Sequence, residues 1–304
     1  AKVIVDDVSY FEEPFFQDGP VANAITKVSS EGVSYLTAAG NENIFEGPRE
    51  IASWEAPQFR DSLSCPAAVQ TELTTKGFPS LCMDFDPGAG VGEEDNTFSF
   101  TVKGESEVIV DLQWAEPWNG VHADLDAYLL QGGAIVEKKK EDNPGVIKKP
   151  VEWFRWKNTK ASSQEVSLVI NRCTATCNPQ AEATAKPRLK VILMGGVIGS
   201  EHSTASGEDV VGPTIYGHAA ANSAIALGAV NYANSTKPEA YSSRGPAKHF
   251  FAPASGKTAA APIPEEVIQK PDVVATDCGA TTFFAQFFSS AWRFCGTSAA
   301  APHA

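Results

Sequence analysis

Pro20-Val-Ala-Asn-Ala-Ile-Thr-Lys-Val-Ser-Ser-Glu-Gly-Val-Ser-Tyr-Leu-Thr-Ala-Ala-Gly-Asn41 is the stretch that indicates most directly how the chain begins to fold. Pro20 suits the first position of a helix, because the backbone N–H that it lacks has no partner there. Apolar residues then recur at helical spacing as far as Val28, and Gly32 provides a C-terminal stop. The next run, Val33–Ala39, is apolar enough for a strand that is buried on both faces. The stretch therefore predicts a helix followed by a buried strand.

A second strand precedes this helix. Lys2–Val8 is rich in Val and Ile, and the order strand, helix, strand forms a βαβ unit. Such a unit implies a parallel sheet with a right-handed crossover. Ligands bind beyond the carboxyl ends of strands in sheets of this kind, which draws attention to Ala38–Asn41.

The pattern changes between residues 61 and 200. Short alternating runs with little helical periodicity favour an antiparallel β-sandwich. The runs are Thr97–Val102, Glu107–Leu112, Ala127–Leu130, Val151–Trp156, Glu165–Ile170 and Leu189–Leu193. After Ser200 the small apolar segments again suggest an α/β arrangement. We therefore expect an α/β fold in two parts, residues 1–60 and 201–304, with a β-sandwich inserted at residues 61–200.

Composition excludes several classes of protein. The chain has 304 residues, a formal net charge of −13 and 43% hydrophobic residues, which is enough for an ordinary buried core. No apolar run is long enough to span a membrane as a helix, so no membrane partner is expected. The acidic balance argues against nucleic acid, because binding phosphates requires a basic surface.

Six cysteines fall into three close couples: Cys65 with Cys82, Cys173 with Cys177, and Cys278 with Cys295. Pairing within each couple is a hypothesis, because six thiols allow fifteen connectivities. A metal site is the alternative, although no Cys-x-x-Cys pair and no suitably spaced histidine supports it. Disulfides predict a secreted, extracellular protein. We expect no metal or other cofactor from this pattern.

The segment Phe294-Cys-Gly-Thr-Ser-Ala-Ala-Ala-Pro-His303 contains the most specific chemical signal. Gly296 permits a tight turn, and small residues after it begin a helix with Ser298 near its start. Backbone N–H groups at such a position can stabilise the oxyanion formed when a nucleophile attacks a carbonyl. The alternative is that Ser298 only caps the helix.

Six segments together resemble the subtilisin-like serine proteases. In chain order they are Val3–Phe11, Thr37–Asn41, Ala224–Val230, Tyr241–Pro246, Lys270–Ala275 and Gly296–His303. The resemblance implies a hydrolase, a serine endopeptidase of the subtilase family, that cleaves protein or peptide substrates by proteolysis.

The resemblance also implies roles for individual residues. Ser298 would be the nucleophile that forms an acyl-enzyme, and the Asn41 amide would help to hold the oxyanion. The residues implied to bind substrate are Ser9, Tyr10, Phe11, Ala38, Ala39, Gly40 and Thr297. Structural packing is the alternative reading of the substrate-binding set.

The sequence departs from that family in one important respect. The family's catalytic Asp and His motifs are missing, so we expect a fragment that is inactive alone. None of the histidines is placed as a general base: His122, His202, His218, His249 and His303. A non-catalytic binding protein with the same fold is therefore the alternative function. An α/β-hydrolase esterase is disfavoured, because the segment around Ser298 lacks the second glycine of the nucleophile elbow.

The insert resembles pre-peptidase C-terminal-type domains, the small β-domains appended to secreted proteases. Structural calcium is an alternative to a solvated face for its alternating aspartates, which are Asp84, Asp86, Asp124 and Asp126. A surface for carbohydrate or polypeptide is an alternative to core packing for its tryptophans, which are Trp114, Trp118, Trp153 and Trp156.

Overall fold

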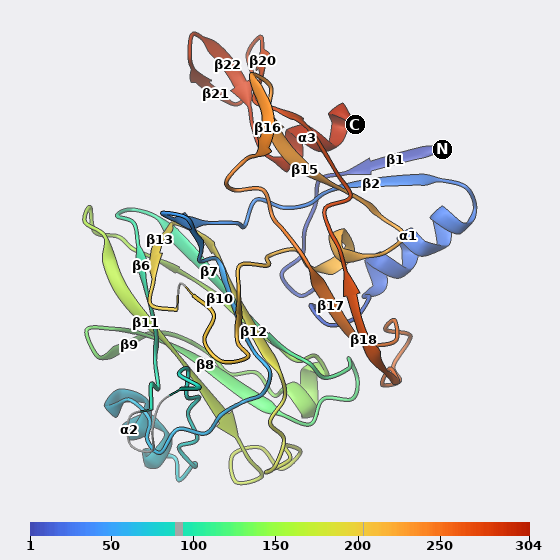
Figure 1. Cartoon of the computed structure of the whole chain (residues 1–304). Helices are drawn as coiled ribbons and strands as arrows, with labels where there is room; N and C mark the ends of the chain where they lie inside the picture. The colour runs from blue at the N-terminus through green and yellow to red at the C-terminus, as the bar shows by residue number, and fades with distance from the viewer. Residues whose placement is uncertain (89–93, 203) are drawn as a thin grey trace. The chain divides into compact units, whose positions relative to one another are not determined.

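A computed structural model of the chain describes residues 1–88, 94–202 and 204–304 (Figure 1). The chain divides into two compact units. Unit 1 comprises residues 1–43, 213–254 and 263–304, and unit 2 comprises residues 44–212 and 255–262. The two boundaries placed from the sequence, after residues 60 and 200, both fall inside unit 2.

Unit 1 is built on a sheet whose strands are mostly parallel. The strands are β1 (Val3–Asp6), β2 (Ser34–Ala38), β15 (Ile225–Asn231), β19 (Val273–Asp277) and the antiparallel β16 (Asn234–Pro238). β2 lies between β1 and β15, and β15 also pairs with β19. The parallel pairing of β1 with β2, connected through α1 (Pro20–Ser30), confirms the predicted βαβ unit.

Two α-helices pack in unit 1. In α1, Pro20 occupies the first turn, and Ala22 and Ile25 are buried against Ala221 and Ala224. The second helix, α3 (Thr297–His303), packs against β15, β19 and β2. A 3-10 turn, η2 (Gly217–Ala220), precedes β15.

The remaining strands of unit 1 form small sheets. β17 (Ala247–Phe251) pairs with β18 (Pro262–Ile268), whose first residue belongs to unit 2. A second small sheet is antiparallel and consists of β20 (Gly279–Thr281), β22 (Ala291–Phe294) and β21 (Gln286–Phe288).

Unit 2 is an antiparallel β-sandwich. One sheet has the order β10 (Val151–Lys157), β7 (Glu107–Trp114), β12 (Leu189–Gly195), β5 (Ser53–Ala56) and β14 (Val210–Val211). The other has the order β13 (Val197–Ser200), β6 (Phe98–Val102), β11 (Gln164–Cys173), β8 (Asp124–Gln131) and β9 (Ala134–Lys139). Side chains from both sheets form one buried core, so the predicted sandwich is confirmed.

Short elements complete unit 2. They are β3 (Phe45–Glu46), β4 (Arg49–Glu50), α2 (Ala67–Thr75) and the π-helical turn η1 (Asn143–Ile147). In the part of the chain that the structure describes, no helix is both long and apolar enough to cross a membrane.

The predicted fold class, an α/β parallel sheet with flanking helices around an inserted sandwich, is wrong for the chain as a whole. Among the described residues about 40% lie in strands and 12% in helices, and most of the sheets are antiparallel. The reason lies in the connections after residue 200. Two residues separate β15 from β16, and β20, β21 and β22 all lie within residues 279–294. Turns of this length join antiparallel neighbours, whereas a parallel crossover needs roughly a dozen residues.

The three disulfides are Cys65–Cys82, Cys173–Cys177 and Cys278–Cys295. They confirm the predicted pairing within each couple, and all six cysteines of the chain are used. Three disulfides are compatible with a secreted protein.

Candidate active site

Hydrogen bonds join three of the predicted site residues, Gly40, Asn41 and Thr297. The Thr297 backbone N–H and hydroxyl donate to Asn41 Oδ1 at 2.9 and 3.2 Å, and Gly40 N–H donates to Thr297 Oγ1 at 3.1 Å. Gly40 and Asn41 follow β2, and Thr297 begins α3. These bonds occupy the carbonyl oxygen of the exposed Asn41 side chain, which leaves its Nδ2 hydrogens for a ligand.

Gly296 allows this close approach. It has a φ of +112°, and a Cβ atom at this position would lie 3.3 Å from the Asn41 amide atoms. A side chain here would therefore be both strained and crowded against Asn41.

Ser298 is half-buried in the first turn of α3, and its hydroxyl lies near enough to the Asp7 carboxylate to influence its pKa. Burial of the carboxylate raises the pKa of Asp7, the Ser298 hydroxyl partly offsets this effect, and the charge of Asp6 raises the pKa further. Sequence reasoning missed Asp7. The available signal was a charged pair, Asp6-Asp7, at the carboxyl end of an apolar strand.

Four predicted substrate-binding residues, Ser9, Ala38, Ala39 and Gly40, line one cavity of about 20 Å³. Other residues around this cavity are Val8, Glu13, Glu42, Tyr216, His218 and Ala219. Tyr10 and Phe11 are not among its lining residues, and the Tyr10 side chain is 54% exposed. Four of the seven residues predicted to bind substrate therefore lie around one cavity.

Glu42 forms one wall of this cavity and was not predicted. Ser243 Oγ donates to Glu42 Oε2 at 2.6 Å and accepts from Glu42 N–H at 3.1 Å. Burial raises the pKa of Glu42. Gly40 has a φ of +100°, and a Cβ atom there would overlap the Glu42 carboxylate, so glycine is required for both reasons.

His218 is buried in the same region but interacts with carboxylates instead of Ser298. Its Nδ1 lies 2.8 Å from Glu13 Oε2, and its Nε2 lies 3.5 Å from Asp6 Oδ2. Burial by itself would lower the pKa of His218, but Asp6 and Glu13 outweigh it and raise the pKa to about 9. Asp6 in turn accepts hydrogen bonds from Thr37 and Tyr35, both at 2.5 Å. His218 is therefore a buried cation at neutral pH.

The other four histidines have their own contacts. His122 lies beside Glu182, His202 beside Asp95, His249 beside Asp18, and His303 beside the Thr276 carbonyl. Among the described residues, no histidine hydrogen-bonds to Ser298. The polar partner of the serine hydroxyl is a carboxylate.

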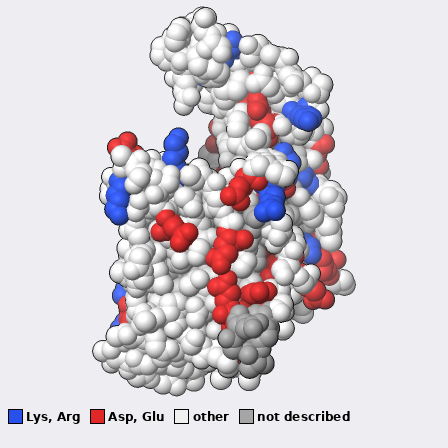
Figure 2. Space-filling model, turned by 60° about the vertical axis from the view of Figure 1, so that its left-hand side comes forward, with Lys and Arg blue, Asp and Glu red and all other residues white. Residues whose placement is uncertain are grey.

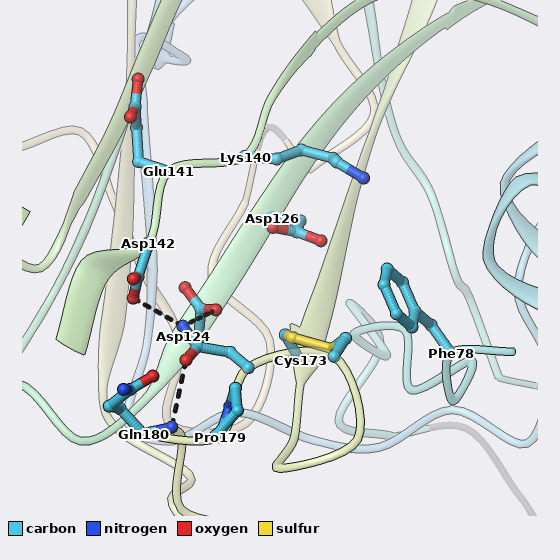
Figure 3. A pocket seen from close by; sticks show the side chains of 11 residues that line it. Phe78, Asp124, Asp126, Lys140, Glu141, Asp142, Cys173, Pro179 and Gln180 are labelled. Carbon is cyan, nitrogen blue, oxygen red and sulfur yellow. Dashed lines mark hydrogen bonds between the residues drawn. A yellow bond between two sulfur atoms is a disulfide. The ribbon is translucent and has the colours of Figure 1, made fainter. Parts of the chain in front are cut away.

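Unit 2 contains a separate acidic pocket of about 250 Å³ (Figure 3). Asp124, Asp126 and Asp142 line it, and Asn178 Nδ2 donates to Asp124 and Asp142 at 2.7 Å each. Burial and the charge of Asp124 raise the pKa of Asp126 to about 7. A protein amide thus already bridges Asp142 and Asp124, and Asp124 is one of the four aspartates named as calcium candidates.

The other two aspartates named as calcium candidates lie in a different network. Asp84 Oδ1 accepts from the backbone N–H groups of Asp86 and Asp95, at 3.1 and 3.0 Å. Asp84 and Asp86 are not among the residues that line the pocket with Asp124 and Asp126.

Among the four tryptophans, Trp114 belongs to the sandwich core, and its Nε1 donates to Glu116. Trp156 packs partly against the same core, and Lys149 lies over the ring of Trp118. Trp153 is half-buried. Core packing accounts for Trp114 and Trp156.

Figure 2 shows several acidic side chains close together on the surface, whereas Lys and Arg are more scattered in this view. This agrees with the net charge of −13. Such a face repels polyanions.

No protein-family model matches the chain, and no curated protein matches it. Among solved structures, it is similar to a cycloisomaltooligosaccharide glucanotransferase from Paenibacillus sp., at 12% identity and a TM-score of 0.22. The alignment covers 62% of this chain and 24% of that structure, so the chain spans about a quarter of that protein's length.

The expected membership of the subtilisin-like serine proteases is wrong on these findings, as is the likeness of the insert to protease-appended domains. The chain is predominantly β, and no comparison given above indicates a subtilisin. Short segments around Ser298 and Asn41 matched a family pattern, but local turn geometry can produce such matches without a shared overall fold.

Proposed function

We propose that unit 1 is a serine endopeptidase in which Ser298 forms an acyl-enzyme and the Asn41 amide stabilises the oxyanion. The observation that carries the proposal is the pair of hydrogen bonds from Thr297, the residue directly before the serine, to Asn41 Oδ1. Because Asn41 Oδ1 is held by two donors, its NH₂ group is fixed in orientation next to the nucleophile. A fixed donor of this kind stabilises developing negative charge without reorganising during the reaction.

Asp7 supplies the proton acceptor in this proposal. Ser298 Oγ attacks the peptide carbonyl carbon while its proton passes to the Asp7 carboxylate. The same proton then reaches the leaving amine as the C–N bond breaks, and water hydrolyses the ester. A carboxylate is a weaker base than imidazole, although its raised pKa reduces the difference. We therefore expect slow turnover of peptides and easier reaction with activated acyl or phosphonyl groups.

The cavity beside the site suggests the substrate. Ser9, Ala38 and Gly40 line a cavity of about 20 Å³, which has room for about one water molecule or a methyl group, so the proposed substrates have glycine or alanine next to the scissile bond. The three disulfides favour secretion, so the proposed substrates are extracellular proteins or peptides.

Labelling with a fluorophosphonate tests the proposal on the folded chain, with the adduct located by mass spectrometry. We expect one adduct, on Ser298, and none in Ser298→Ala. Ser289→Ala, which removes a serine on an exposed turn of the same unit, is the matched control and should label normally.

Two further variants separate the roles of the neighbours. Asn41→Asp keeps an acceptor for Thr297 but removes the amide donor, and it should slow labelling by about 100- to 1,000-fold. Asp7→Asn removes the base and should flatten the rise of the labelling rate with pH. If a correctly folded chain gives no adduct, or if Ser298→Ala labels equally, the catalytic proposal is wrong.

A non-catalytic peptide-binding protein is the second candidate. It is favoured by the absence, within the described residues, of any histidine that hydrogen-bonds to Ser298. Binding of an extended peptide without labelling of Ser298 would support it.

A further inference from the structure

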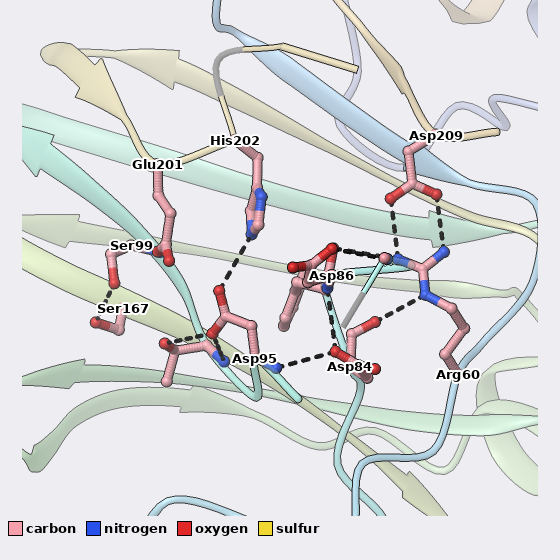
Figure 4. A network of polar contacts seen from close by, with 12 residues as sticks. Arg60, Asp84, Asp86, Asp95, Ser99, Ser167, Glu201, His202 and Asp209 are labelled. Atoms are coloured by element: carbon pink, nitrogen blue, oxygen red, sulfur yellow. Dashed lines mark hydrogen bonds and ion pairs between the residues drawn. The ribbon is translucent and has the colours of Figure 1, made fainter. Parts of the chain in front are cut away.

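Three potential metal ligands converge in unit 2, outside the candidate active site. Asp95 precedes β6, and Glu201 and His202 directly follow β13. One ligand atom from each of these residues lies within 4.8 Å of the other two, and His202 Nε2 is 3.8 Å from Asp95 Oδ2 (Figure 4). Pairing of β13 with β6, extended by a hydrogen bond from Glu201 N–H to the Ser99 carbonyl at 2.9 Å, brings them together.

Each carboxylate is oriented through one of its oxygens. Asp95 Oδ1 accepts from the backbone N–H of Thr97 at 3.2 Å and from its hydroxyl at 3.3 Å. Glu201 Oε2 accepts from Ser99 N–H at 2.7 Å. The two carboxylates also approach each other, and Asp95 Oδ2 faces His202 Nε2. Outer contacts that fix a ligand in this way are typical of metal centres.

The His202 ring is held by aromatic side chains. It stacks on Phe85 at 5.9 Å with an interplanar angle of 21°, and the Phe98 ring lies 5.2 Å away. His202 Nε2 is buried from solvent and has no hydrogen-bond partner among the described residues. An imidazole nitrogen in a ring that is fixed in this way is able to bind a metal ion.

Two carboxylates meet at this point, because one oxygen of Asp95 and one of Glu201 lie within 4.8 Å of each other and of a His202 ring nitrogen. Two negative charges this close repel each other unless a cation or a proton lies between them. The nearby Arg60 guanidinium is occupied by Asp209, at 2.8 and 2.9 Å.

We propose that Asp95, Glu201 and His202 form a binding site for one Zn²⁺ ion per chain. Zinc binds one imidazole nitrogen and two carboxylate oxygens at about 2.0–2.2 Å, which requires ligand atoms roughly 3.4 Å apart. The ligand atoms lie within 4.8 Å of one another, with 3.8 Å between His202 Nε2 and Asp95 Oδ2, so the side chains must close by up to about 1.4 Å to bind the ion. Glu201 is exposed, so water can occupy the fourth position. Calcium prefers six to eight oxygen ligands, and an imidazole disfavours it. The ion would tie the end of β13 to the segment before β6.

Zinc titration of the full chain, freed of metal by chelation, tests the site. We expect a stoichiometry of one by calorimetry, and visible absorption of tetrahedral intensity when Co²⁺ replaces zinc. Calcium should not compete. Glu201→Gln and His202→Asn should each weaken zinc binding at least about tenfold and abolish the cobalt bands.

The chain offers a matched control, because His122 and Glu182 form an exposed pair with nitrogen and oxygen 3.1 Å apart. Glu182→Gln and His122→Asn should leave zinc binding unchanged. Near-ultraviolet circular dichroism checks that every variant is folded, and Glu201→Gln alters an exposed side chain. The proposal is overturned if the folded wild-type chain binds no zinc at 100-fold molar excess, or if the His122 and Glu182 variants lose binding while the site variants retain it.

Discussion

Glu152 is a carboxylic acid with no exposed surface, at the second position of β10. Glu141 N–H donates to its Oε1 at 2.7 Å, whereas its Oε2 has no partner among the described residues. Burial raises the pKa of Glu152 to about 9. The folded protein therefore keeps a proton that the unfolded chain releases above pH 4.5, and stability falls as pH rises from about 4.5 to 9.

We predict that Glu152→Gln removes this pH dependence and stabilises the protein at pH 8. For the wild type, the slope is up to about 1.4 kcal/mol per pH unit. Urea unfolding at pH 5, 6.5 and 8 measures the effect, and Glu165→Gln on the exposed face of β11 is the control. Equal slopes for wild type and Glu152→Gln would show that Glu152 is ionised in the folded protein.

His218 gives a second pH dependence, in unit 1. Its folded pKa of about 9 lies above the ordinary 6.5, so its contribution to stability is complete below pH 6.5 and is lost as pH rises through 9. We predict that Glu13→Gln lowers the His218 pKa and destabilises the protein by about 3 kcal/mol at pH 6, because the buried imidazolium loses one carboxylate.

NMR titration of the His218 ring, together with thermal unfolding, tests this prediction. Glu31→Gln at the exposed end of α1 is the control and should change neither quantity. A His218 midpoint that stays near 9 in Glu13→Gln would contradict the assigned cause.

The residues of the candidate active site could be predicted only in part. The quoted segments suggested Ser298 and Asn41. In the structure, the Asn41 side chain accepts a hydrogen bond from the backbone of Thr297, the residue directly before Ser298. Asp7 and Glu13 were missed because their partners, Ser298 and His218, are more than 200 positions away in sequence. Periodicity reports which face of an element is apolar, but not which distant polar group meets it.

At the scale of elements, prediction succeeded where the pattern was local. The helix α1 has a proline start and an apolar face. Five of the six alternating runs of the sandwich lie within a strand, and the sixth, Thr97–Val102, begins one residue before β6. It failed for residues 279–294, where short strands pair across turns. Consecutive phenylalanines do not show the period of two that marks a half-buried strand, because side chains on both faces are exposed there.

In the small sheet β20–β22–β21, the neighbouring residues Phe283 and Phe284 differ in how they pack. Phe283 is 79% exposed, whereas the Phe284 ring lies 5.0 Å from the Phe294 ring. We predict that Phe283→Ser changes the free energy of unfolding by less than about 0.5 kcal/mol and reduces self-association, because it removes an exposed apolar group. Phe284→Ser should cost about 1 kcal/mol through its lost ring contact. Thermal unfolding and light scattering measure the two effects, and equal destabilisation by both substitutions would contradict the difference in packing.

At the scale of the whole molecule, unit 2 is nearly continuous in sequence. Its main core is formed entirely by residues between Ile44 and Val211, which include Trp54, Trp114 and Phe98. A second cluster around the Cys65–Cys82 disulfide also lies within this range. Only residues 255–262 join unit 2 from later in the chain, and they contribute nothing to either cluster.

We therefore predict that residues 44–212 fold when expressed alone under oxidising conditions. A domain of this size buries enough apolar surface to be stable, and none of its core residues would be missing. The expected result is cooperative urea unfolding and a near-ultraviolet circular dichroism spectrum from packed tryptophans. Trp54→Ala, which removes a side chain with 1% exposure, should abolish the cooperative transition or reduce stability by about 3–5 kcal/mol. A fragment with intact disulfides but without tertiary signal would show that residues 255–262 or unit 1 are required for the sandwich to pack.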